Sequence, residues 1–163
     1  MKLMEIVKVP DERLRQKSSP IDCVDNSLKP LVDDMIYTMH RVGGIGLAAI
    51  QVGIPKRLMV IDVREDNSEP ICIINPVILR FGDNTNTMQE GCLSIPECVV
   101  NMVRPSEVVL EYTTLSGEKV TCDASGILAR VIQHEFDHLE GKLLLDHVVA
   151  DNRQKPVQES ELR

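Results

Sequence analysis

Two segments of the chain have apolar side chains at helical spacing. Between residues 27 and 42 an apolar residue recurs every three or four positions, which predicts an amphipathic helix that ends at the glycines 43 and 44. A second helix is expected from Ser125 to about Glu140, with Gly141 as its C-terminal stop. Apolar residues cover a wide arc of this second helix, so we expect it to be buried on most sides.

Short runs of β-type residues lie between the two predicted helices, separated by turn-forming residues such as Gly82-Asp83-Asn84 and Ser116-Gly117. The runs are Arg57–Val63, Ile71–Arg80, Cys98–Arg104, Glu107–Thr114 and Lys119–Cys122. This order of elements predicts an α+β fold, in which antiparallel strands pack around a central helix and an N-terminal helix precedes them.

The length of 163 residues is typical of one domain with a single sizeable core, and we expect that domain to span residues 1–150. No internal repeat or interior linker divides the chain. The segment 151–163 is polar, contains Pro156 and has no apolar period, so it is predicted to be a disordered tail.

Composition and charge exclude several classes of protein. The formal net charge is −7 and the isoelectric point is about 5.1, which argues against a nucleic-acid-binding or membrane-surface protein. No apolar run is long enough to span a bilayer, and the N-terminal residues lack the features of a secretory signal. Five cysteines without the spacing of a disulfide scaffold favour a reducing, cytoplasmic location.

The second predicted helix contains the most informative motif, His134-Glu135-Phe136-Asp137-His138. Residues four positions apart share one face of a helix, so the two histidines can bind one divalent metal ion. Glu135 lies beside the first histidine and can take a proton from a water on that metal. The other histidines, His40 and His147, have no patterned neighbours and are expected to be structural or exposed.

A catalytic metal needs a third protein ligand and an open position, and two further clusters offer the missing parts. Cys92 follows a glycine in the segment 90–94, where a cysteine is either a metal ligand or a small buried apolar residue. The other four cysteines are expected to be such apolar residues. The small residues of 43–51 either admit an extended peptide as an added strand, with Gln51 as an amide donor, or form a helix cap and a tightly packed strand.

Three segments together resemble the signature motifs of the peptide deformylase family: GIGLAAIQ at 44–51, EGCLS at 90–94 and QHEFDHLEG at 133–141. They occur in the family's order and at about its spacing, and the resemblance extends over roughly residues 5–148. It implies an enzyme that removes the formyl group from the N-terminal formyl-methionine of newly made polypeptides and releases formate. The expected partner is therefore a nascent polypeptide.

The resemblance also implies a metal centre. Its ligands would be Cys92, His134 and His138, with a water molecule at the fourth position. A thiolate ligand favours softer ions over magnesium or calcium. The family implies iron(II) as the physiological ion, with zinc, nickel or cobalt as substitutes.

Residue roles in catalysis and substrate binding follow from the same motifs. Glu135 would take the proton of the attacking water and pass it to the departing amine. The side-chain amide of Gln51 and the backbone N–H of Leu93 would stabilise the oxyanion, where each preorganised donor is worth roughly 3 kcal/mol. The residues expected to bind the substrate are Ile45, Gly46, Gly91 and Val131.

Four features depart from the family's pattern. Val99 and Gly43 stand where many relatives have an arginine and an acid that help to hold the peptide backbone, so substrate grip beyond the first residue is expected to differ. Arg130 stands at a methionine-pocket position that is usually apolar, and we expect its aliphatic stem to line the wall while its charged head reaches water. The near-neutral tail differs from the long basic helix by which some relatives dock on the ribosome, so the ribosome is a candidate partner only.

Two alternative functions compete with deformylation. A metallopeptidase of the His-Glu-x-x-His type is disfavoured because no third histidine or glutamate follows at the required spacing, and because Cys92 would then have no role. A catalytically silent protein that holds peptides by strand addition is disfavoured because Glu135, Gln51 and all three metal-binding side chains are present.

Overall fold

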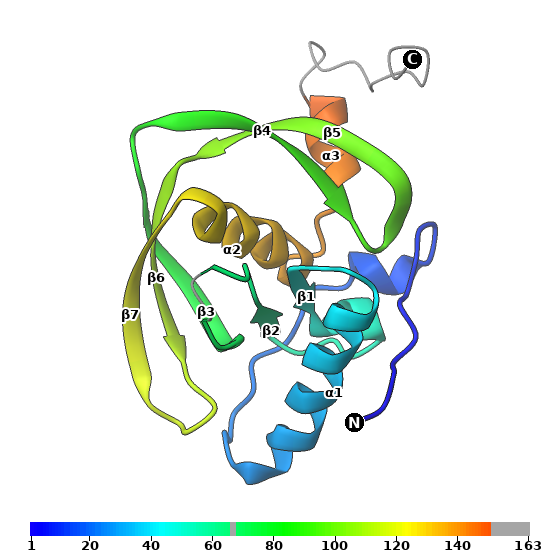
Figure 1. Ribbon diagram of the computed structural model, residues 1–163, viewed down its shortest axis with the longest axis vertical. Coiled ribbons are helices and arrows are strands. Elements are labelled where there is room, and N and C mark those ends of the chain that lie inside the picture. The colour runs from blue at the N-terminus through cyan, green and yellow to red at the C-terminus, as the bar shows by residue number, and fades with distance from the viewer. Residues whose placement is uncertain (66–67, 151–163) are drawn as a thin grey trace.

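The computed structural model describes residues 1–65 and 68–150, so the predicted tail at 151–163 lies outside the described residues (Figure 1). The helices are α1 (Lys29–Arg41), α2 (Gly126–Leu139) and α3 (Leu144–Ala150), with short 3-10 turns η1 (Glu12–Arg15), η2 (Asn26–Leu28) and η3 (Ala49–Val52). The strands are β1 (Gly46–Ala48), β2 (Leu58–Ile61), β3 (Ile71–Phe81), β4 (Thr85–Cys92), β5 (Ile95–Pro105), β6 (Glu107–Thr113) and β7 (Lys119–Ser125).

All strand pairs are antiparallel, and they form two separate sheets. Five strands pair in the order β1-β2-β3-β6-β7, while β4 and β5 form a hairpin of their own. Helix α2 lies between this hairpin and the five-stranded sheet (Figure 1). The predicted α+β fold, with antiparallel strands around a central helix, is confirmed.

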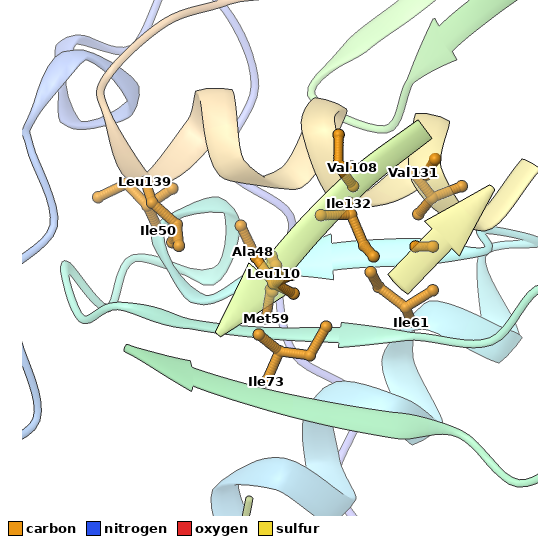
Figure 2. Close-up of a cluster of buried hydrophobic side chains, with 12 residues drawn as sticks. Ala48, Ile50, Met59, Ile61, Ile73, Val108, Leu110, Val131, Ile132 and Leu139 are labelled. Carbon is orange, nitrogen blue, oxygen red and sulfur yellow. The ribbon is translucent and has the colours of Figure 1, made fainter. Parts of the chain in front are cut away.

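Strand β2 is buried along its whole length because helices cover both faces of the sheet there. Met59 and Ile61 face α2 and join one apolar cluster with Ile132, as Figure 2 shows. The alternate residues Leu58 and Val60 belong to a second cluster, on the side of α1. Successive side chains of a strand point to opposite faces, so an all-apolar strand is what a doubly covered position requires.

Helix α1 is the helix predicted at 27–42, and local signals fix both of its ends. Asp25 accepts a hydrogen bond from the backbone N–H of Ser27, at the start of the turn η2 that leads into the helix. Pro30 lies in the first helical turn, where its missing N–H costs little. Gly43, with φ of 76°, occupies the left-handed region that ends the helix.

The sequence pattern missed two elements. Strand β4 was not predicted because most of its residues are polar and exposed, and only one face of the hairpin contacts the protein. Helix α3 is only 7 residues long, too short for a helical period to stand out. The expectation that four cysteines are buried is wrong: Cys23 is exposed, and Cys72, Cys98 and Cys122 are only partly buried. Within residues 1–65 and 68–150, no helix has the length and apolar character to cross a membrane.

Removing a side chain from the cluster between the sheet and α2 should destabilise the protein strongly. Leu110 of β6 is fully buried in this cluster, so Leu110→Ala is expected to lower the free energy of unfolding by about 2–5 kcal/mol in urea titrations. Leu79→Ala on β3 is the matched control, since Leu79 is 53% exposed and its loss should cost less than about 0.5 kcal/mol. Equal losses for both variants would contradict this assignment of the core.

Candidate metal centre

Strand β4 and helix α2 bring one cysteine and two histidines together. His134 and His138 are one helical turn apart on α2, with ring centroids 5.2 Å from each other. Cys92 ends β4, and its Sγ lies 3.3 Å from Nε2 of His138. A ligand atom from each of the three residues lies within 4.8 Å of the others.

The chemistry of this group fits a soft or borderline divalent cation. A thiolate and two imidazoles are ligands of zinc, iron and cobalt, whereas magnesium and calcium prefer oxygen. Burial lowers the pKa of His134, but hydrogen bonds to Cys92 and Glu90 outweigh it and raise that pKa to about 10. The pKa of His138 is lowered to about 3, by burial and by the neighbouring His134. The surroundings therefore favour one positive charge in this group, at the His134 side. A bound metal ion would supply such a charge.

Glu135 is a buried carboxyl group placed between α2 and β1. Burial is the main cause that raises its pKa to about 7. Its Oε2 has no hydrogen-bond partner among the described residues. The other oxygen, Oε1, lies close to the backbone of Gly46. A Cβ added to Gly46 would lie 2.5 Å from this oxygen and 2.7 Å from Cγ1 of Val131. Only glycine leaves this carboxyl group room beside β1.

The Gln51 side chain is held at both ends of its amide group. Its Oε1 accepts a hydrogen bond of 2.9 Å from the backbone N–H of Ala48. Its Nε2 donates to Oγ of Ser94 at 3.1 Å and lies 3.8 Å from Sγ of Cys92. The amide hydrogens therefore point toward the Cys92 side of the site. The sequence reasoning assigned no role to Ser94, although it lies within a recognised motif.

A buried ionic network behind the histidines was also missed. Glu90 accepts a hydrogen bond from Nδ1 of His134 at 3.0 Å, and its two oxygens pair with the Arg104 guanidinium at 2.7 and 3.0 Å. Arg104 also donates to Asp137 at 3.0 Å. Burial raises the pKa of Glu90, but the hydrogen bonds from His134 and Arg104 outweigh it and lower the pKa to about 2. The sequence signal that could have indicated this network is a charged residue at an inward-facing position of each strand, Glu90 on β4 and Arg104 on β5.

The expectation that the charged head of Arg130 reaches water is wrong. The residue is buried, and its Nη1 donates to Oε1 of Glu90 at 2.6 Å and to the carbonyl of Met102 at 3.0 Å. Its Nη2 donates to the carbonyl of Asn86 at 2.9 Å and also to the side chain of that residue. A carboxylate and backbone carbonyls of the β4–β5 hairpin thus replace water around the guanidinium.

A cavity of about 420 Å³ connects these side chains. Every predicted site residue except His138 lines it: Ile45, Gly46, Gln51, Gly91, Cys92, Leu93, Val131, His134 and Glu135. Gly43, Val99 and Arg130 line it as well. His40 and His147 pair with Asp62 and Asp137 instead, so neither joins the three-residue group.

Comparison with known proteins agrees with this geometry. The sequence model of the polypeptide deformylase family matches residues 3–154. The chain belongs to the peptide deformylase family. A peptide deformylase of Nitrosococcus oceani is 43% identical over 163 residues, which cover 100% of this chain and 97% of that protein. One of Phenylobacterium zucineum is 45% identical over 159 residues, which cover 96% and 94%.

Solved peptide deformylases have the same fold. The crystal structure of the Thermotoga maritima protein matches with a TM-score of 0.86 and 40% identity, and the match covers 90% of this chain and 98% of that one. The Acinetobacter baumannii protein with bound Met-Ala-Ser matches with a TM-score of 0.86 and 32% identity, over 90% and 98%. Peptide deformylases are metal-dependent hydrolases, and this chain is an enzyme that removes the N-formyl group from newly made polypeptides.

Adding one methyl group at Gly46 should disturb the site without unfolding the protein. In Gly46→Ala the new Cβ must displace the Glu135 carboxyl group or Val131, so we expect kcat for deformylation to fall by about 100-fold. Metal content and thermal stability should stay close to those of the parent, because the neighbours that must move are side chains rather than backbone. A variant with normal kcat would show that the position of Glu135 does not matter for turnover.

Proposed function

We propose that Glu135, Gln51 and Leu93 carry out the hydrolysis of formyl-methionine at a metal held by Cys92 and the two histidines. The observation that supports this most is the convergence of three groups on one cavity: a thiol with two imidazoles, an unpartnered carboxyl oxygen and a fixed amide. Hydrolysis of a formamide needs all three groups, because water must be activated, protons must be moved and an oxyanion must be stabilised.

Cys92, His134 and His138 would hold iron(II) as the physiological ion, with zinc, nickel or cobalt as substitutes. When bound, such an ion polarises the substrate carbonyl and lowers the pKa of water toward neutrality. The Nδ1–H of His134 donates to Glu90, which leaves Nε2 of that ring for the metal. A carboxylate on the remote nitrogen also makes the imidazole a stronger ligand.

Glu135 would accept the proton of the attacking water and deliver it to the departing amine. Burial disfavours the carboxylate and raises its pKa to about 7, so this group can be both protonated and deprotonated at neutral pH. Its unpartnered Oε2 is free to accept a hydrogen bond. The fixed amide of Gln51 and the backbone N–H of Leu93 would donate to the oxyanion without having to reorient.

The substrate peptide would bind as an extra strand. β1 is the edge strand of the five-stranded sheet, and residues 43–46 and 89–93 border the same cavity. An extended peptide placed between them can pair with the backbone of Ile45, Gly46 and Gly91, while its first side chain enters the space beside Val131. The Met-Ala-Ser bound to the Acinetobacter baumannii relative supports a peptide that begins with methionine.

The proposed setting is the cytoplasm, where nascent chains are made. All five cysteines are free, which supports a reducing environment. Docking on the ribosome stays a prediction, because the segment on which it would depend lies outside the described residues.

Formate release separates the proposed activity from its alternatives. With iron(II) under anaerobic conditions, the protein should release formate from formyl-Met-Ala-Ser and leave its peptide bonds intact. A metallopeptidase would cut peptide bonds without releasing formate, and a silent binding protein would do neither. Either of these results would overturn the proposal.

The proton-transfer role of Glu135 can be tested on the same substrate. Glu135→Ala should bind metal as the parent does and lose about 10²- to 10⁴-fold in kcat, since the site then lacks its general base. Metal content by elemental analysis serves as the control. Near-normal turnover of a fully loaded variant would show that another group moves the proton.

Replacing the thiol should separate a ligand from a structural cysteine. Cys92→Ser is expected to weaken iron(II) and zinc binding, because a hydroxyl group stays protonated at neutral pH and is a poor ligand for these ions. Cys98→Ser, which changes another cysteine that lines the cavity, should bind metal as the parent does. Equal metal retention by both variants would make Cys92 a structural residue.

A further inference from the structure

The Glu90 carboxylate is the point at which the metal ligands connect to the rest of the protein. It accepts four hydrogen bonds, two from Arg104, one from Arg130 and one from His134. A carboxylate has about four acceptor positions, so its hydrogen-bonding capacity is full. Each oxygen has two donors: Oε2 accepts from His134 and Arg104, and Oε1 accepts from Arg104 and Arg130.

The periods of strand and helix place these groups opposite each other. Glu90 and Cys92 are two residues apart on β4, while Arg130, His134 and His138 follow at four-residue intervals on α2. Two strand residues span about 6.6 Å and one helical turn about 5.4 Å. Over this short length, residues two apart on β4 therefore lie opposite residues four apart on α2. Glu90 therefore bonds with both Arg130 and His134, and Cys92 lies against His138.

Both terminal nitrogens of Arg130 donate hydrogen bonds to the hairpin, whereas its Nε has no partner among the described residues. Its Nη1 joins Glu90 on β4 to the carbonyl of Met102 on β5, and its Nη2 bonds with Asn86 at the other end of β4. Arg104 is held from a different direction, by Asp137 of α2. Arg104 of β5 and Arg130 of α2 thus both donate to Oε1 of Glu90, which leaves the carboxylate little freedom to rotate.

We propose that Arg130 is a positioning residue of this enzyme, which holds Glu90 so that Glu90 fixes the imidazole of His134 in the orientation that binds metal. The inference rests on the proposed role of His134 as a metal ligand. Without Arg130, Oε1 of Glu90 keeps only Nε of Arg104 as a donor, and the carboxylate can turn away from His134. Loss of such an outer partner costs about 10- to 100-fold in metal affinity.

The test uses cobalt(II), whose visible absorption reports ligand geometry, and needs no substrate. This matters because Arg130 also lines the cavity, so an effect on KM alone would not separate the two roles. Arg130→Met should raise the cobalt dissociation constant about 10- to 100-fold and alter the cobalt spectrum. If Arg130→Met does not fold, Arg130→Lys takes its place, since a single ammonium group cannot bond with Glu90, Met102 and Asn86 at once.

Arg57→Met is the matched control. Arg57 makes a similar ion pair, with Nη1 2.6 Å from Oε1 of Glu140, but it does not touch Glu90. Its replacement should lower thermal stability and leave cobalt affinity and spectrum unchanged. A loss of affinity in both variants would assign the effect to general destabilisation and overturn the proposal.

A double-mutant cycle with Glu90→Gln decides whether Arg130 acts through Glu90. We expect the double variant to lose about as much cobalt affinity as the weaker-binding single variant, because both changes break the same connection. The proposal would be overturned if the loss of cobalt affinity in the double variant equalled, within about twofold, the product of the losses in the two single variants. Normal cobalt binding in the Arg130 variant would also overturn it. Failure of the proposed metal site looks different: the parent and Cys92→Ser would then have the same cobalt spectrum, with no thiolate-to-cobalt band that depends on Cys92.

Discussion

A buried helix can carry ionisable side chains only if charge pairing within the protein replaces most of the hydration that they lose. Helix α2 lies between two sheets, so water cannot solvate its charged and polar side chains freely. Glu90, Arg104, Arg130 and Asp137 meet this requirement as one connected set of ion pairs behind the histidines. The proposed metal centre would therefore depend on charge pairing as much as on Cys92 and the two histidines.

The two sheets contribute to the site in different ways. The five-stranded sheet packs against the apolar side of α2, and its edge strand β1 is the one to which the substrate is proposed to add. The β4–β5 hairpin packs Ile95, Val100 and Met102 in an apolar cluster that contains no residue of α2. Toward α2 it presents Cys92, Glu90 and the carbonyls that hold Arg130. The hairpin is thus attached to α2 largely by polar bonds, which have stricter geometry than apolar contacts. Such attachment suits an element that has to position a ligand.

Much of the fold followed from local sequence, but the buried network did not. The helix at 27–42 and the buried helix carrying His134 were predictable because apolar spacing and glycine stops are local properties. The proximity of Cys92 to the two histidines was predictable because recognised motifs contain all three residues. The partners of Arg130 were not, since a lone charged residue does not indicate whether its head meets water or a carboxylate 40 residues away. Strand β4 was missed because its polar bonds replace the apolar alternation that marks a strand.

The double coverage of β2 has a consequence for how the enzyme would lose its metal. Helix α2, which carries both histidines, packs on a strand that is buried along its whole length. Removing α2 from that strand would expose the core, so the two histidines cannot move far from their places without general unfolding. An ion that binds only the folded chain adds its binding free energy to folding. Chelation should therefore shorten the lifetime of the enzyme in the cell, as unfolded chains are the substrate of proteases.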